Sequence, residues 1–128
     1  SEAAIKSYEQ ALVTFGIEKS LLTLEDQREF ATKVFEKMIK TYKNAGKSNE
    51  ARATIERART LLGKADLFAD KQLISFLRES GKKQEALQTI QTVRKDFTDD
   101  YSLMRIEATI LTELGRVDEG VALIKGLI

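Results

Sequence analysis

The stretch GKKQEALQTI, residues 81–90, decides how the rest of this sequence is interpreted. Its glycine is typical of the end of one helix, its polar residues form a short turn, and a new helix follows with Ala86 and Ile90 on its apolar side. The same arrangement starts again at Gly46 and at Gly115. In each copy a Glu follows the glycine by four residues, a small residue by five and an Ile by nine. The copies are 35 and 34 residues apart, and a fixed period of this length indicates repeated helix pairs.

The composition favours a single helical domain. The chain has 128 residues, of which 42% are hydrophobic, enough for a continuous core and too many for a disordered chain. Proline is absent, and strong helix formers occur throughout the sequence. We therefore expect an all-α fold over residues 1–128.

Apolar residues at helical spacing predict seven helices. Their expected ranges are 1–15, 24–45, 48–62, 66–80, 83–97, 100–114 and 117–127. Short turns between most of them make successive helices antiparallel neighbours. Each helix is too short to be stable alone, so its apolar stripe is expected to be buried by stacking on the next one. The predicted fold is a right-handed α-solenoid of antiparallel helix pairs.

This pattern resembles the tetratricopeptide repeat, a helix-turn-helix unit of about 34 residues. The resemblance covers a half repeat at 1–16, an extended connection at 17–31 and three repeats. The matching positions are Met38, Tyr42, Gly46, Ala51, Ile55 and Ala58 in repeat 32–66, Leu73, Leu77, Gly81, Ala86 and Ile90 in repeat 67–100, and Met104, Ala108, Leu111, Gly115 and Ile124 in repeat 101–128. The repeats are degenerate, since Val93, Gly120 and Leu127 replace alanines and the usual proline at each repeat junction is missing.

Most catalytic and cofactor chemistry is excluded by residue types. The chain has no Cys and no His, which removes disulfides, thiol nucleophiles, the usual zinc sites and a Ser-His-Asp unit. We expect no enzyme activity, no cofactor and no metal. No apolar run approaches the ~18 residues of a membrane span. We expect a soluble protein, with the cytoplasm slightly favoured over the periplasm, although the absence of Cys does not fix the compartment.

The resemblance implies where a partner would bind. In tetratricopeptide proteins the first helix of each repeat lines a concave groove that holds a segment of another protein. The polar sides of the corresponding helices carry a basic set of residues, and the candidate partner-binding residues are Lys33, Lys37, Lys40, Asn44, Phe68, Lys71, Gln72, Ser75 and Arg105. Rows of lysine are also common on solvated surfaces without a partner.

The expected function is that of a scaffold or adaptor which binds a peptide segment, possibly acidic, in this basic groove. One alternative is an RNA-binding helical repeat, but 21 Lys and Arg against 20 Asp and Glu give a net charge of only +1. The other alternative is a structural module that associates with itself. The apolar segment at 123–128 makes its C-terminal end the expected contact, or indicates that the chain is part of a longer protein.

Glu107 is the one acidic residue in the middle of an apolar stripe, between Leu103 and Ile110. A buried carboxylate without a partner costs several kcal/mol. We therefore expect it either to reach solvent or to pair with a cation such as Arg94, Arg116 or Lys125.

Overall fold

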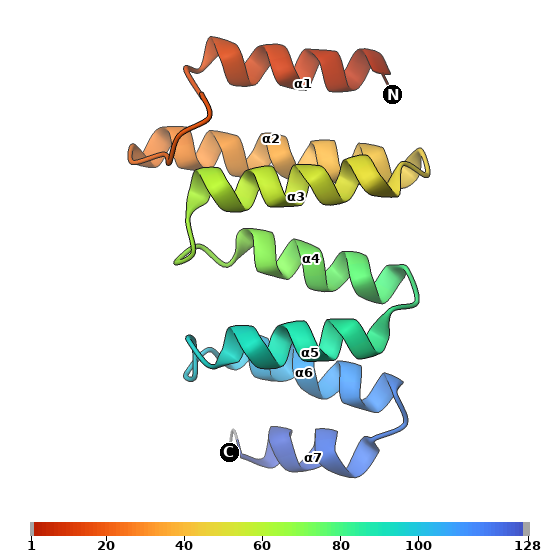
Figure 1. Cartoon of the computed structure of the whole chain (residues 1–128). Coiled ribbons are helices and arrows are strands. Elements are labelled where there is room, and N and C mark those ends of the chain that lie inside the picture. The colour runs from red at the N-terminus through yellow and green to blue at the C-terminus, as the bar shows by residue number, and fades with distance from the viewer. Residues whose placement is uncertain (1, 127–128) are drawn as a thin grey trace. The chain divides into compact units, whose positions relative to one another are not determined.

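The computed structural model describes residues 2–126 and contains seven α-helices and no strand over that range (Figure 1). This confirms the predicted all-α class. The helices are α1 (Glu2–Thr14), α2 (Glu25–Asn44), α3 (Ser48–Leu62), α4 (Phe68–Glu79), α5 (Lys83–Arg94), α6 (Tyr101–Glu113) and α7 (Val117–Lys125). None of the helices in this part of the chain is both long enough and apolar enough to cross a lipid bilayer.

The chain divides into two compact units, Ser1–Ala69 and Asp70–Ile128, with the boundary near the start of α4. The first unit contains α1, α2 and α3, and α2 packs against both of the others. The second unit contains most of α4 with α5, α6 and α7, and α6 packs against both α5 and α7. The two units are described separately below, and the single domain expected over 1–128 stays a prediction.

The turn at the start of each repeated phrase has one hydrogen-bonding pattern. At Gly81, the N–H of the glycine donates to Arg78 O over 3.2 Å, and the N–H of Lys82 donates to Leu77 O over 2.8 Å. This pair of bonds defines a Schellman motif, which needs a residue with positive φ after the helix. Gly81 has φ of 77°, where an L-residue with a Cβ atom is strained.

The same two bonds recur at the other predicted turns. Gly46 donates to Lys43 O and Lys47 to Tyr42 O, and both glycines at 46 and 115 have positive φ, 73° and 82°. The turns therefore reverse the chain within about three residues, so that α2 and α3 lie side by side in the first unit and α6 and α7 in the second (Figure 1).

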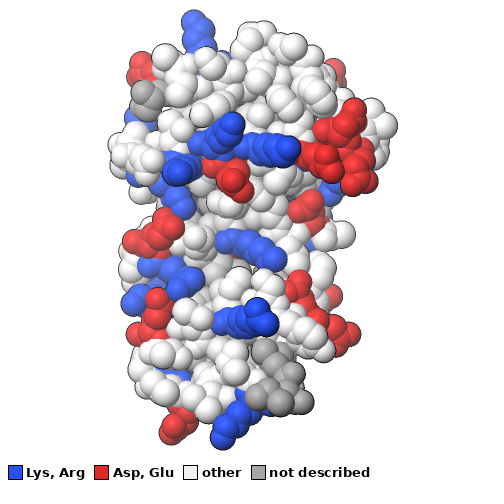
Figure 2. All heavy atoms as spheres, turned by 180° about the vertical axis from the view of Figure 1, so that it is seen from behind, with Lys and Arg blue, Asp and Glu red and all other residues white. Residues whose placement is uncertain are grey.

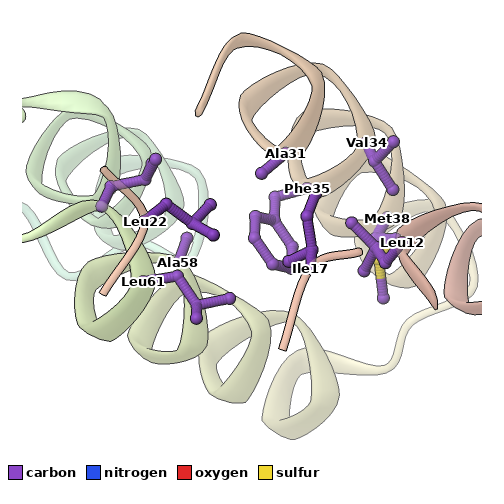
Figure 3. Close-up of a cluster of buried hydrophobic side chains, with 10 residues drawn as sticks. Leu12, Ile17, Leu22, Ala31, Val34, Phe35, Met38, Ala58 and Leu61 are labelled. Atoms are coloured by element: carbon purple, nitrogen blue, oxygen red, sulfur yellow. The ribbon is translucent and has the colours of Figure 1, made fainter. Parts of the chain in front are cut away.

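The core of the first unit is formed by α1, α2, α3 and the connection before α2. Figure 3 shows Phe35 and Met38 of α2 facing Leu12 of α1 and Ile17 of the connection, with Ala58 of α3 in the same cluster. Phe35 is completely buried, and the guanidinium carbon of Arg57 lies 5.4 Å from the centroid of its ring. Burial of this apolar stripe explains why α2 forms although its sequence is rich in charged residues.

Arg28 holds the connection against the end of α3. Its Nη1 donates to Leu22 O over 2.9 Å, and its Nη2 donates to Leu62 O over 2.8 Å and to Asp66 Oδ2 over 3.1 Å. The planar guanidinium can serve three acceptors that a lysine could not reach together. The extended connection predicted at 17–31 is thereby fixed in place, but its last residues, 25–31, already belong to α2.

Two helix boundaries differ from the prediction for local reasons. The helix expected at 66–80 begins only at Phe68, because the Asp66 carboxylate binds Arg28 and also accepts the N–H of Phe68 over 2.9 Å. The helix expected at 83–97 ends at Arg94. The backbone N–H groups of residues 95–97 instead donate to the carbonyl oxygens three residues earlier. This pattern gives tighter turns than an α-helix. The end of the helix expected at 117–127, Leu127, lies outside the described residues.

The core of the second unit contains a buried ion pair, which confirms one of the two alternatives for Glu107. The side chain of Glu107 is only 9% exposed, and Arg94 Nη1 donates to its Oε1 over 2.7 Å. Leu103 and Ile110, its neighbours in the predicted stripe, are completely buried. Arg94 is therefore the partner of Glu107. The Nε atom of Arg94 is buried as well, and it has no acceptor among the described residues.

Gly120 replaces one of the alanines of the repeat pattern because α6 and α7 approach closely at this point. A Cβ atom there would lie 2.9 Å from the backbone oxygen of Ala108 and 3.0 Å from Thr112 Oγ1. Backbone atoms cannot move as freely as the end of a long side chain. A Cβ atom at position 120 would therefore force α6 and α7 apart.

We therefore expect Gly120→Ala to destabilise the protein by about 1–2 kcal/mol, although Gly→Ala within a helix ordinarily stabilises by up to about 1 kcal/mol. Urea unfolding followed by circular dichroism measures the change. Gly126→Ala serves as a control at the end of the same helix, where the nearest atom is 3.3 Å away. Equal stability of Gly120→Ala and the parent would contradict the close approach of α6 and α7.

Candidate functional site

The clearest candidate surface is the polar side of α2. Lys33, Lys37, Lys40 and Asn44, which we name the α2 lysine row, follow one another at spacings of four, three and four residues and are all exposed. Such spacing places side chains on one side of a helix. The opposite side carries Val34, Phe35 and Met38 into the core, so packing fixes the direction in which the row points.

The row is not uniformly basic along its length. Lys33 lines a shallow groove together with Glu25, Glu29 and Asp66, and one of these acids, Asp66, is already paired with Arg28. Glu36 is exposed one residue before Lys37. Figure 2 shows the same mixture over the face in view, with basic side chains beside groups of acidic ones and wide uncharged areas. Lys37 and Lys40 are therefore the cations of the row that do not line that groove.

Phe68, one of the candidate partner-binding residues, contacts the interior of the first unit. It is half-buried and packs against the core cluster of the first unit that contains Phe35 and Leu62. An aromatic side chain that already contacts the core has less surface to offer as an anchor for a partner. We therefore assign Phe68 to the packing of the first unit.

The remaining predicted residues belong to the second unit and vary in accessibility. On α4, Lys71, Gln72 and Ser75 are half-buried, and Ser75 Oγ donates to Glu79 Oε1 over a long 3.4 Å. On α6, Arg105 is exposed. The most accessible cation of this set is thus Arg105.

A second cation of α4, Arg78, is neutralised within the unit. Its Nε and Nη2 donate to the two carboxylate oxygens of Glu113, each over 3.1 Å. The hydrogen bonds from Arg78 hold the pKa of the Glu113 carboxyl below its ordinary value. Sequence reasoning missed this pair, although the two residues are 35 apart, which is the interval between the phrases at Gly46 and Gly81.

A groove between α6 and α7 was also missed. It has a volume of about 580 Å³ and is lined by Ala108, Thr109 and Thr112 of α6 and by Gly120, Val121 and Ile124 of α7, with Arg105, Glu113 and Lys125. The apolar stripe of the helix expected at 117–127, which includes Val121 and Ile124 at helical spacing, was expected to be buried, but these two side chains are 45% and 38% exposed. Helical periodicity identifies an apolar face and does not say whether the chain covers it.

The described part of the chain has no cluster of three or more acidic side chains placed to hold a metal ion. In comparisons with protein-family models, with curated proteins and with solved structures, no match to this chain was found.

Proposed function

We propose that this chain is a tetratricopeptide-like module, without catalytic activity, that binds an acidic segment of another protein. The proposed architecture is a right-handed solenoid of helix pairs. The support for it is the Schellman turn at Gly46, Gly81 and Gly115, repeated at intervals of 35 and 34 residues.

The single observation that carries the function is the exposure of Lys37 and Lys40 on a helix whose other side is fixed in a core. Arg28, Arg57 and Arg78 each form an ion pair with an acidic side chain, and the ammonium groups of Lys37 and Lys40 take no part in these pairs. Aligned cations raise the local potential well beyond what a net charge of +1 suggests. Asn44 adds an exposed amide that can donate to or accept from a peptide backbone.

The chemistry of these residues defines the partner class. Exposed ammonium groups attract carboxylates, and each exposed contact contributes only ~0.2–1 kcal/mol. A segment with several acidic residues is therefore needed, and its binding is expected to be modest in affinity and sensitive to salt.

The test uses a fluorescein-labelled 12-residue peptide of alternating Glu and Ser, followed by fluorescence anisotropy at low salt. We expect the double variant Lys37→Glu, Lys40→Glu to weaken binding by about tenfold, because two attractions become two repulsions. The matched control is Lys6→Glu, Lys19→Glu, which makes the same change in net charge at exposed positions of the same unit.

Equal losses in both double variants would mean that the probe senses only net charge, and the proposal would fail. A single-stranded RNA of 12 nucleotides tests the alternative function with the same variants. RNA has stacking bases as well as charge, so strong binding of the RNA over the acidic peptide would favour an RNA-binding repeat.

A further inference from the structure

The α6/α7 groove points to a second binding site, independent of the α2 lysine row. On α6 its lining residues Arg105, Ala108, Thr109 and Thr112 stand at positions i, i+3, i+4 and i+7, which is one complete helix face. The face extends over about 10 Å at 1.5 Å per residue.

The α7 side of the groove is broader. Gly120, Val121, Ile124 and Lys125 stand at positions i, i+1, i+4 and i+5, which spread over about 140° of the helix surface at 3.6 residues per turn. The missing side chain at Gly120 lets α7 lie close to α6 there. Two helix faces that meet in this way leave a groove between their ridges, and a third helix is the element that fits such a groove.

The surface of the groove is more apolar than its residue list suggests. The hydroxyl groups of Thr109 and Thr112 both donate to carbonyls inside α6, to Arg105 O and Ala108 O, each over 2.9 Å. These donors are no longer free for a ligand, whereas Val121 and Ile124 are 45% and 38% exposed. An occupant should therefore present an apolar face.

The charges of the groove lining that no described partner balances are positive. Among the described residues, Glu113 is the single carboxylate of the lining, and both of its oxygens accept from Arg78. Arg105 and Lys125 are exposed on α6 and α7, respectively, and no other acid among the described lining residues can balance them. The groove thus combines an apolar surface with uncompensated positive charge, which complements an apolar face flanked by carboxylates.

We infer that the α6/α7 groove binds an amphipathic, acidic α-helix of another protein. Apolar side chains of that helix at i, i+3 or i+4, and i+7 contact Val121 and Ile124, while acidic residues beside them meet Arg105 and Lys125. The groove lies within the second unit, so this inference does not depend on the α2 lysine row of the first.

The probe for the test is a labelled 16-residue helical peptide with Leu at every third or fourth position and Glu on both flanks of the Leu face. We expect Ile124→Asn to weaken its binding at least about tenfold, because the contact loses apolar area. Val117→Asn is the matched control, since Val117 is 48% exposed on the same helix but does not line the groove. It should change the dissociation constant less than about twofold.

The requirement for opposite charges is tested by reversing the charges on the protein and on the peptide. The double variant Arg105→Glu, Lys125→Glu should lose affinity for the Glu peptide and gain it for a peptide in which Lys replaces every Glu. Both residues are exposed, so circular dichroism should show a fold like that of the parent. The double variant Lys37→Glu, Lys40→Glu should bind the Glu helix almost as the parent does, which separates this site from the lysine row.

Three results would overturn the inference. The first is equal binding of the Glu and Lys peptides to the parent protein. The second is equal loss in Ile124→Asn and Val117→Asn. The third is a parent protein that dimerises in sedimentation velocity and becomes monomeric in Ile124→Asn, because the occupant would then be a second copy of this chain.

Discussion

Phe35→Ala is expected to lower the free energy of unfolding by about 3–5 kcal/mol, the largest effect of any substitution considered. Phe35 is completely buried where α1, α2, α3 and the connection meet, so no neighbouring side chain can close the cavity without moving a helix. Its ring also lies beneath the guanidinium of Arg57, and that contact is lost as well.

Urea unfolding and thermal melting followed by circular dichroism at 222 nm measure this change. A loss of this size corresponds to a fall in melting temperature of about 10 °C or more. Tyr101→Ala is the control, because Tyr101 is an aromatic residue that is 62% exposed at the start of α6 and should cost less than about 0.5 kcal/mol. If the two variants were equally stable, α2 would not pack through Phe35.

Arg94→Met is expected to destabilise the second unit by about 2–4 kcal/mol, because it leaves the carboxylate of Glu107 buried without its partner. The value lies at the lower end for buried pairs, since the side chain of Arg94 is 21% exposed and water can reach part of the site. Methionine keeps most of the apolar stem of arginine. The loss of stability therefore measures the missing charge rather than missing packing.

Substitution of the other member of the pair, Glu107, should not destabilise the unit in this way. Glu107→Leu is expected to leave stability unchanged or to raise it, because leucine continues the stripe of Leu103 and Ile110 and Arg94 can turn to solvent. Arg94 Nε is already buried without an acceptor, so the pair is not a fully satisfied network.

A double-mutant cycle with Arg94→Met and Glu107→Leu isolates the interaction of the two side chains. We expect the double variant to recover most of the stability lost in Arg94→Met. A double variant as unstable as Arg94→Met alone would show that Arg94 stabilises the unit through contacts other than Glu107.

The helices and turns were predictable from local sequence because their causes are local. A glycine with the phrase that follows it sets both the Schellman turn and the start of the next apolar stripe, as at Gly81 and Ala86. The cap of α6 was predictable for the same reason: Asp100 accepts the N–H of Leu103 over 3.0 Å, as expected for an acidic residue at a helix start.

The surfaces were harder to predict, because accessibility depends on residues far away in the sequence. Lys33, Lys37 and Lys40 were placed correctly on one exposed side, since a single helix decides it. Phe68 lies at an element end, and its contact with the core of the first unit could not be derived from periodicity. Val121 and Ile124 follow the pattern of a buried stripe, yet the described chain leaves them exposed.

The ion pair of Glu107 with Arg94 was predictable only in part. Helical spacing placed Glu107 inside the apolar stripe, and the cost of an unpaired buried charge then required a cation. Three cations were within reach by sequence, and only the packing of α5 on α6 selects Arg94. Physical reasoning therefore predicted the need for a partner, and the tertiary structure decided its identity.

The central claim is that the α2 lysine row is the surface that holds an acidic segment. A titration of the ¹⁵N-labelled protein with the alternating Glu and Ser peptide, followed by amide chemical shifts, tests it most directly. We predict progressive changes in chemical shift concentrated at residues 33–44 of α2, reduced at higher salt and requiring about tenfold more peptide in Lys37→Glu, Lys40→Glu. Shifts confined to α1, α3, α5 or α7, or an unchanged spectrum at millimolar peptide, would contradict the claim.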